Sequence, residues 1–399
     1  MAKQARGMIA SALAGAMALT VSAGTAFAQD IVIGLNMVKS GALKSVGEAT
    51  ETSVDIAVEE INAKGGINGR KIRLVKFDTG SDPRQAATAT QKFAQDDKAL
   101  AVIGPFSSGE AAVAFPLGER LGIVQIPNAA SAPGLTGKFT YAWRLTADEG
   151  TQFTRLLTSL RNKNVPISKA EIMYVSDERV SNISGTQFYP AILKAAGIAA
   201  GDPVAFQLKT FDLAPQVSQV LQRNPDVVAL AGTPDSAGKV IKELRRQGFK
   251  GRVIGSQIFA DPNSMELFGK DADGLLIVAG FWPDRNDATR AFSKKYMEEN
   301  AKRGLTMKKV PHHVDAWGYD IVYLLKQAME KANVTGDPAK LAAERTAIRD
   351  ALVGIRFTGI SGENICFNEA RDARLPGFII EINDLKWNLY DQHPAEQCN

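Results

Sequence analysis

The sequence predicts an α/β protein of two Rossmann-like lobes, each with a parallel central sheet. Short apolar runs alternate with segments whose apolar residues recur at helical spacing, an order typical of parallel strands covered by helices on both faces. The alternation breaks around residues 146–150 and then begins again, which indicates a second lobe. A chain of 399 residues also exceeds one ordinary core and suits two domains.

The first half contains four predicted strands separated by helices. The helix over 47–63 carries apolar residues at helical spacing and ends at Gly65, because glycine readily takes the positive φ of a helix cap. Asp82 is a good cap and Pro83 suits a first helical position, so a second helix is expected to begin there. In order, the expected elements are a strand at 31–37, a helix at 47–63, a strand at 72–77, a helix at 82–97, a strand at 100–103, a helix at 110–121 and a strand at 123–126.

The second half repeats this pattern and then adds a C-terminal part. The repeat is expected to hold strands at 170–175, 204–206, 227–231, 252–254 and 275–279, with helices at 185–196 and 235–247 and a Ser/Gln-rich helix before 227. The C-terminal part is expected to hold helices at 288–302, 314–333 and 338–353, and strand-like segments at 355–357, 377–382 and 387–390. We expect these helices to return to the first lobe and the last strands to the second.

Residues 1–28 have the pattern of a secretory signal peptide. Lys3 and Arg6 precede an apolar run at 8–19, and Ala26 and Ala28 supply the small-x-small site for cleavage after Ala28. The alternative, an uncleaved anchor, is disfavoured because the apolar run is short for a bilayer span. Export without direct membrane insertion is therefore predicted.

Charge and cysteine content narrow the classes of partner. The 47 basic and 43 acidic residues are dispersed along the chain, so neither a nucleic-acid footprint nor a polybasic membrane patch is visible. The two cysteines, Cys366 and Cys398, lie near the C-terminus, and an even count in an oxidising compartment predicts one disulfide.

No catalytic or cofactor motif emerges from the sequence. Gly34 follows the first strand without a GxGxxG pattern, so a dinucleotide site has no support. His312 and His313 are possible metal ligands, but adjacent residues at a helix start are expected to point to different faces. We therefore predict a protein that is not an enzyme and that carries no cofactor or metal.

Two polar turns follow the third and fourth predicted strands. Ser107 and Ser108 lie where a helix begins, and a helix N-terminus at the carboxyl end of a parallel strand suits an anionic group. The second turn, at 128–131, would lie beside the first if its strand is the neighbour. The plainer alternatives are an ordinary serine N-cap and a simple β-turn.

These segments together resemble the periplasmic Leu/Ile/Val-binding proteins and their relatives, which share the type I periplasmic binding fold. The resemblance covers nearly all of the chain after the leader. It rests on 61–69 (INAKGGING), Phe77 and Asp78 with Asp82 and Pro83, 102–104 before Ser107 and Ser108, and 127–131 (PNAAS).

The resemblance implies two lobes joined by three hinge crossings, near 147–150, 279–283 and 376–378. The N-terminal lobe would comprise 29–148 and 281–376, and the C-terminal lobe 149–280 and 377–399. It also implies a monomeric periplasmic receptor of an ABC importer, which closes on a small carboxylate-bearing ligand and delivers it to permease subunits.

The resemblance also assigns ligand positions. Ser108 matches the serine that binds the ligand carboxylate, and Ala129 and Ser131 match the turn that assists it. Tyr319 falls where an aromatic side chain commonly lines the pocket, although a core tyrosine is equally compatible.

Other positions depart from the family pattern. Gln257 stands where amino-acid binders have the glutamate that pairs with the ligand ammonium. Val46 and Ser181 replace aromatic residues, and the loop with Thr233 and Asp235 lacks the usual tyrosine.

These departures leave the ligand open between an amino acid and an aromatic or oxo acid, because a buried ammonium needs a carboxylate partner. Glu178 and Asp235 are possible substitutes for that partner. Lys44 and Arg179 are candidate partners for a carboxylate, with solvated surface charges as the alternative. Phe259 and Trp282 are candidates for a stacking wall, with core positions as the alternative. The alternatives to an importer receptor are the ligand-sensing subunit of a signalling system and a cleft enzyme such as a hydrolase.

Overall fold

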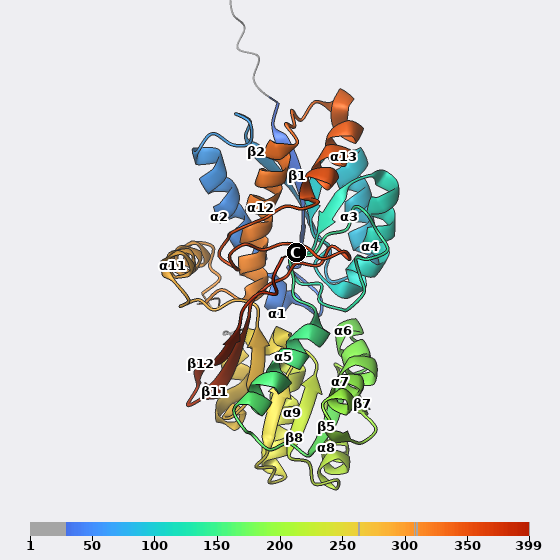
Figure 1. The fold of residues 1–399 in the computed structure, drawn as a ribbon, viewed down its shortest axis with the longest axis vertical. Helices are drawn as coiled ribbons and strands as arrows, with labels where there is room; N and C mark the ends of the chain where they lie inside the picture. The colour runs from blue at the N-terminus through green and yellow to red at the C-terminus, as the bar shows by residue number, and fades with distance from the viewer. Residues whose placement is uncertain (1–28, 262–263, 307, 309, 399) are drawn as a thin grey trace, which may run out of the picture.

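The computed structural model describes residues 29–261, 264–306, 308 and 310–398. The predicted leader, 1–28, lies outside these residues. The described chain forms two α/β bodies, one above the other in Figure 1, each built on its own sheet. Among the described residues, no helix has the length and apolar character that a membrane span requires.

The first sheet has four parallel strands in the order β2-β1-β3-β4. Alternate residues of β1 are buried on opposite faces: Ile31 and Ile33 pack with α2, α12 and α13, whereas Val32 packs with α3. The elements are β1 (Ile31–Met37), β2 (Ile72–Asp78), β3 (Ala101–Ile103), β4 (Val124–Ile126), α2 (Thr50–Ala63), α3 (Pro83–Gln95), α4 (Ser108–Leu121), α12 (His313–Lys331) and α13 (Leu341–Leu352). The predicted burial of a parallel sheet on both faces is thus confirmed.

The second sheet has eight strands in the order β12-β11-β10-β9-β8-β5-β6, with β7 also paired to β5. Its strands are β5 (Lys169–Val175), β6 (Ala199–Ala200), β7 (Val204–Phe206), β8 (Val227–Ala231), β9 (Arg252–Gly255), β10 (Leu276–Ala279), β11 (Gly377–Asn383) and β12 (Lys386–His393). Strands β11 and β12 run antiparallel to their neighbours and form an antiparallel edge on the predicted parallel central sheet. A tight hairpin can join antiparallel strands directly, which is how the chain adds two strands without a crossover helix.

Helices cover both faces of the second sheet as well. Their bounds are α5 (Glu149–Asn162), α7 (Tyr189–Ala195), α8 (Ala214–Leu221) and α9 (Pro234–Arg246). Helices α5 and α7 share one apolar cluster with the sheet, and α8 and α9 share another.

The chain passes between the two bodies three times. It crosses from β4 to α5, from β10 to α11 (Asp287–Lys302) and α12, and from α13 to β11. Gly280 lies in the second passage, where a Cβ would come within 2.1 Å of the Trp317 ring, so only glycine fits without displacing that side chain. Three passages agree with the expected connectivity, and the residue limits of the lobes remain a prediction.

Several elements differ from their expected form. The helix expected at 47–63 is divided into α1 (Lys44–Gly47) and α2, and that expected at 185–196 comprises a π-helical turn at Ser184–Phe188 followed by α7. At 355–357 there is an isolated bridge from Phe357 to Ile365 in place of a strand. The short elements α6 (Arg179–Ile183), α10 (Met265–Phe268) and the 3-10 turns at Gln257–Ala260 and Gly269–Ala272 were not expected, and the helix expected at 338–353 begins with a 3-10 turn at Pro338–Lys340.

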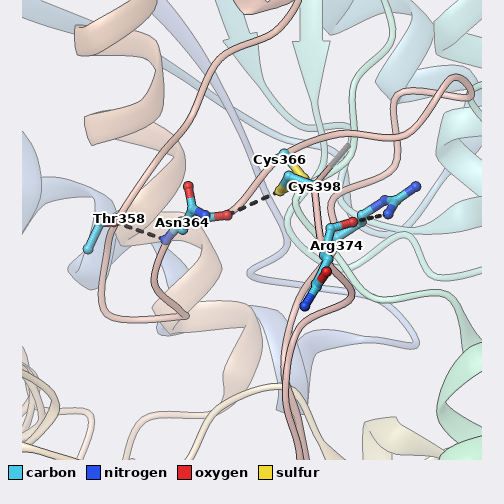
Figure 2. The surroundings of a disulfide bond; sticks show 6 residues. Thr358, Asn364, Cys366, Arg374 and Cys398 are labelled. Carbon is cyan, nitrogen blue, oxygen red and sulfur yellow. Dashed lines mark hydrogen bonds between the residues drawn. A yellow bond between two sulfur atoms is a disulfide. The ribbon is translucent and has the colours of Figure 1, made fainter.

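The predicted disulfide is confirmed. Cys366 and Cys398 are bonded, with Cα atoms 6.0 Å apart, and Figure 2 shows how the bond ties the C-terminal tail to the segment after α13. The guanidinium of Arg374 holds the same tail by donating to the carbonyl of Gln397. By loop-closure entropy, a bridge that spans 32 residues contributes about 3.7 kcal/mol to stability.

Candidate functional site

A small cavity, lined by apolar and polar residues, lies between the two sheets, where the carboxyl ends of their parallel strands face each other. Its volume is about 40 Å³. The first body contributes Leu43, Phe106, Ser107, Ser108, Ala129, Ser131, His313, Val314 and Trp317. The second body contributes Glu178, Val180, Ser181, Gly232, Ser256, Gln257 and Ile258. Strand ends of this kind are the usual ligand sites of open α/β sheets.

The N-terminus of α4 forms one wall of this cavity. The Ser107 hydroxyl caps the helix by accepting from the backbone N–H of Glu110 (3.3 Å). The Glu110 carboxylate in turn accepts from the backbone N–H of Ser107 (2.7 Å) and from the Thr79 hydroxyl. Burial raises the pKa of Glu110, against the effect of these hydrogen bonds. The capping box fixes the direction in which the first turn of α4 faces the cavity.

The second polar turn packs directly against this helix start. Strands β3 and β4 are neighbours, as expected, and the Ser108 hydroxyl accepts from the backbone N–H of Ala132 (3.1 Å). Beneath the turn, the fully buried Arg144 donates to the carbonyl of Ala132 (2.7 Å) and forms a bidentate pair with Asp372 (2.8 and 2.6 Å). Arg144 therefore positions the turn that carries Ser131.

Glu178 lines the cavity from the second body. It caps α6, and its carboxylate accepts from the N–H of Val180 (3.1 Å) and from the N–H and hydroxyl of Ser181 (2.7 and 2.6 Å). These three donors fix the carboxylate at the cavity surface.

The segment that passes from β4 to α5 orients the side chain of Gln257. Its side-chain amide N–H donates to the carbonyl of Ala147 (3.0 Å), while its side-chain oxygen is buried without a partner. Behind it, the fully buried Glu149 accepts from the Tyr189 hydroxyl (3.0 Å) and the backbone N–H of Gln257 (3.3 Å). Burial raises the pKa of Glu149.

His313 and Trp317, one turn apart at the start of α12, close the remaining side. Both side chains are buried, and His313 Nδ1 and Trp317 Nε1 have no hydrogen-bond partner. Burial lowers the pKa of His313 well below its ordinary value, so the ring is neutral at physiological pH. The rings of His312 and His313 lie 3.7 Å apart, so the expectation that they point to different faces is wrong. His312 is the extended N-cap of α12, which brings the two rings together.

A buried ion pair connects the two bodies beside the cavity. Lys308 Nζ lies 3.4 Å from the Asp261 carboxylate and also donates to the carbonyl of Ser45. Lys308 and Ser45 belong to the expected N-terminal lobe, and Asp261 belongs to the C-terminal one. Both charged side chains are less than a tenth exposed.

The structure gathers six of the sequence-predicted site residues around this cavity: Ser107, Ser108, Ala129, Ser131, Ser181 and Gln257. The other four do not line it. Val46 lies in the core, Thr233 caps α9, and Asp235 is exposed on the first turn of α9. The Tyr319 hydroxyl donates to Glu60 (2.7 Å) and its ring packs on Phe292, so this side chain serves the packing of α12.

Some of the other residues considered as ligand contacts from the sequence line the cavity, and others do not. Lys44 and Arg179 are exposed and do not line the cavity, whereas Glu178 does. Phe259 is buried in the core of the second body, and Trp282 packs against the same cluster.

Sequence reasoning missed His313, Trp317 and Ser256 as lining residues. The position of Ser256 directly after a strand was a usable signal, because Ser107 and Ser131 were found that way. The pair His313 and Trp317, four residues apart, had no such signal, since the pattern does not tell which face of α12 meets the cavity.

A larger cavity of about 520 Å³ lies elsewhere, between α5 and α7. It lacks the convergent buried polar groups that characterise ligand sites. Within the described part of the chain, no group of three histidine, cysteine or acidic side chains is arranged to hold a metal ion.

Two α/β bodies that face each other across a cavity are the architecture expected of a two-lobed solute-binding protein. The chain belongs to the periplasmic binding protein family, whose model matches residues 30–386. The predicted family and fold are therefore confirmed.

Individual relatives agree with this assignment. The Leu/Ile/Val-binding protein of Escherichia coli (strain K12) is 28% identical over 348 residues, which cover 83% of this chain and 86% of that protein. The structure of a branched-chain amino acid transporter substrate-binding protein from Streptococcus pneumoniae, in complex with isoleucine, matches with a TM-score of 0.76 and 23% identity, over 92% of this chain and 99% of that one.

A solved structure with a different ligand matches equally well. A solute-binding protein of an ABC transporter from Rhodopseudomonas palustris BisB5, in complex with 3,4-dihydroxybenzoic acid, has a TM-score of 0.76 and 18% identity, over 92% of this chain and 96% of that one. All three relatives are binding proteins by name. The prediction of a non-enzyme is confirmed, and the shared fold leaves the ligand to be argued from the site.

Proposed function

We propose that this chain is the periplasmic receptor of an ABC importer, which closes about its hinge on a small carboxylate-bearing solute. The observation that carries the proposal is the position of the cavity between the strand ends of both sheets. On one side the capped start of α4 and the turn at 129–132 offer backbone N–H and hydroxyl donors, which suit a carboxylate. A solute held there contacts both lobes at once and so favours the closed form.

The size of the cavity supports a hinge motion. A volume of about 40 Å³ accommodates a water molecule or so, whereas ligand pockets typically have several hundred Å³. Entry of an amino acid or aromatic acid therefore requires the two lobes to separate. The buried pair of Lys308 and Asp261 must part in the same motion, because its members come from opposite lobes.

A thermal-shift panel tests the proposal. We expect one class among branched-chain amino acids, aromatic carboxylates and oxo acids to raise the melting temperature, because a ligand at 100 times its dissociation constant stabilises the native state by about 2.7 kcal/mol. The amide of each acid is the matched control and should give a much smaller shift. Equal shifts for acid and amide, or no shift with any acid, would contradict a carboxylate receptor.

The export and partner predictions are tested separately. The intact mass of protein recovered from a periplasmic extract should correspond to a chain that begins at Gln29, with or without cyclisation of that glutamine, as expected for cleavage after Ala28. Stimulation of the ATPase activity of the cognate permease complex by the ligand-loaded protein, and not by the ligand alone, would support delivery to an importer. Absence of stimulation with every loaded ligand would contradict it.

A further inference from the structure

The charges around the cavity point to a zwitterionic solute. Among the described residues that line it, Glu178 alone carries a charged side chain, and His313 is neutral. Lys44 and Arg179 lie outside the lining, and the ammonium of Lys308 is already engaged by Asp261 and Ser45. A solute with only a negative charge would thus share the site with the Glu178 carboxylate and meet no cationic side chain.

The Glu178 carboxylate has capacity for one further donor. Its two oxygens offer about four acceptor positions, and the two N–H groups and the Ser181 hydroxyl occupy three. The same bonds hold the carboxylate in place before any solute arrives. Little side-chain entropy is then lost when a cation binds to it.

Gln257 provides a second acceptor without a donor. Its side-chain oxygen is buried and unpartnered, and its amide nitrogen is committed to the carbonyl of Ala147. A glutamate at this position would have no proton to donate to Ala147 and would stand beside the Glu149 carboxylate. The structure thus favours an amide at position 257. The negative charge that neutralises a bound ammonium must then come from another residue.

The residues that line the cavity also include donors without acceptors. The indole N–H of Trp317 has no partner, and the start of α4 presents backbone N–H groups at Ser108. The cavity therefore combines acceptors that lack donors with donors that lack acceptors. This combination matches a molecule that carries both an ammonium and a carboxylate.

We propose that Glu178 is the acceptor for the ammonium group of an α-amino acid, with Gln257 as a neutral second acceptor. The proposal rests on the proposed function and narrows its solute class. It makes Glu178 a specificity-determining residue, in place of the glutamate that position 257 lacks.

Matched ligand pairs test this by isothermal titration calorimetry. The probes are L-valine, L-leucine and L-phenylalanine, each compared with the 2-hydroxy acid in which a hydroxyl replaces the ammonium. With the wild-type chain we expect at least one amino acid to bind about 10- to 150-fold more tightly than its hydroxy acid, as for a buried hydrogen bond between charged groups. This comparison needs no variant and so does not depend on how a substitution folds.

The Glu178→Gln variant should lose that preference. We expect the affinity for the amino acid to fall by about 10- to 150-fold, while that for the hydroxy acid stays equal or improves. Asp177→Asn is the matched control, because it removes one negative charge from the adjacent, exposed residue and keeps an acceptor for the N–H of Leu208. It should leave the ratio of affinities unchanged.

The possible failures are distinguishable. An unchanged ratio in Glu178→Gln overturns the role of Glu178. Tighter binding of a hydroxy or aromatic acid than of any amino acid by the wild type overturns the zwitterionic solute but leaves a carboxylate receptor standing. Binding of no member of any pair overturns the zwitterionic solute, and the thermal-shift panel of aromatic and oxo acids then decides whether the carboxylate receptor stands.

Discussion

At the scale of single residues, Ser108 links the two polar turns of the first lobe. Its hydroxyl accepts from the N–H of Ala132, and its own backbone N–H lies on the first turn of α4. The residue thus holds the two turns in register and faces the cavity. Few substitutions affect the proposed carboxylate site as directly as one at this position.

The Ser108→Ala variant should bind its solute about 1–3 kcal/mol more weakly, because the Ala132 N–H loses its acceptor and the carboxylate loses a nearby hydroxyl. Calorimetric titration measures the change, and the melting temperature of the unliganded variant reports on the fold. Thr88→Ala, on the exposed side of α3, is a control that should bind normally. Equal affinity in wild type and Ser108→Ala would remove this serine from the site.

Arg144 acts beneath the same turn. Replacement by Met should destabilise the protein by about 3–5 kcal/mol, because it leaves the Asp372 carboxylate without its bidentate partner and the Ala132 carbonyl without a donor. Urea unfolding measures this loss. A loss below about 1 kcal/mol would show that the pair is solvated and does not position the turn.

The sequence predicted the first-lobe part of the site better than the second. Ser107, Ser108, Ala129 and Ser131 directly follow parallel strands, so their convergence follows from sheet geometry. Tyr319 does not line the cavity, because its hydroxyl bonds to Glu60, and the sequence left both a pocket position and a core position open for it. Glu178 lines the cavity because of its capping bonds to α6, a short helix that no sequence pattern predicts.

At the scale of elements, α12 begins beside the cavity with an acidic residue in its first turn. Asp315 is buried and accepts from the Tyr296 hydroxyl (2.8 Å) and the backbone N–H of His312 (2.9 Å). Burial raises the pKa of Asp315 from 3.8 to about 7, although Lys308 opposes this shift. The native protein therefore holds a proton here that the unfolded chain has already released.

The raised pKa of Asp315 determines whether stability rises or falls with pH. Between about pH 4 and pH 7 the native state binds more protons than the unfolded chain, so stability falls as the pH rises and levels off above about pH 7. Across this range, the free energy of unfolding of the wild type should fall by up to about 4 kcal/mol relative to that of Asp315→Asn, because each unit of pKa shift corresponds to about 1.4 kcal/mol. Urea unfolding of both proteins at several pH values measures the difference. A difference that is constant with pH contradicts the raised pKa.

Most elements were predictable because their patterns are local. Periodic apolar residues and caps such as Asp82 with Pro83 define the helices of both lobes, and the strands are short buried runs. The direction of β11 and the division of the helix at 47–63 were not predictable, because strand pairing and helix breaks depend on the packing of distant segments.

At the scale of the whole molecule, the buried pair of Lys308 and Asp261 stabilises the arrangement in which the lobes meet. In Lys308→Met the Asp261 carboxylate loses this cation on closure, whereas opening returns the carboxylate to water. The open form should therefore gain population, and solute affinity should fall by about tenfold or more. A matched double variant, Lys308→Met with Asp261→Leu, removes both charges and should recover part of the affinity. Unaltered affinity in Lys308→Met would mean that the pair does not bias closure.

The account depends on closure of the two lobes around a solute at the cavity between them. Single-molecule energy transfer tests this closure most directly. The dyes are attached to cysteines introduced at two exposed positions, Lys98→Cys in the first body and Lys209→Cys in the second. Both native cysteines are held in the disulfide and so do not compete for the dyes. The account predicts a low-efficiency population without solute that shifts to higher efficiency as the stabilising acid is titrated, with a midpoint equal to its dissociation constant. One unchanged efficiency from zero to saturating solute would contradict it.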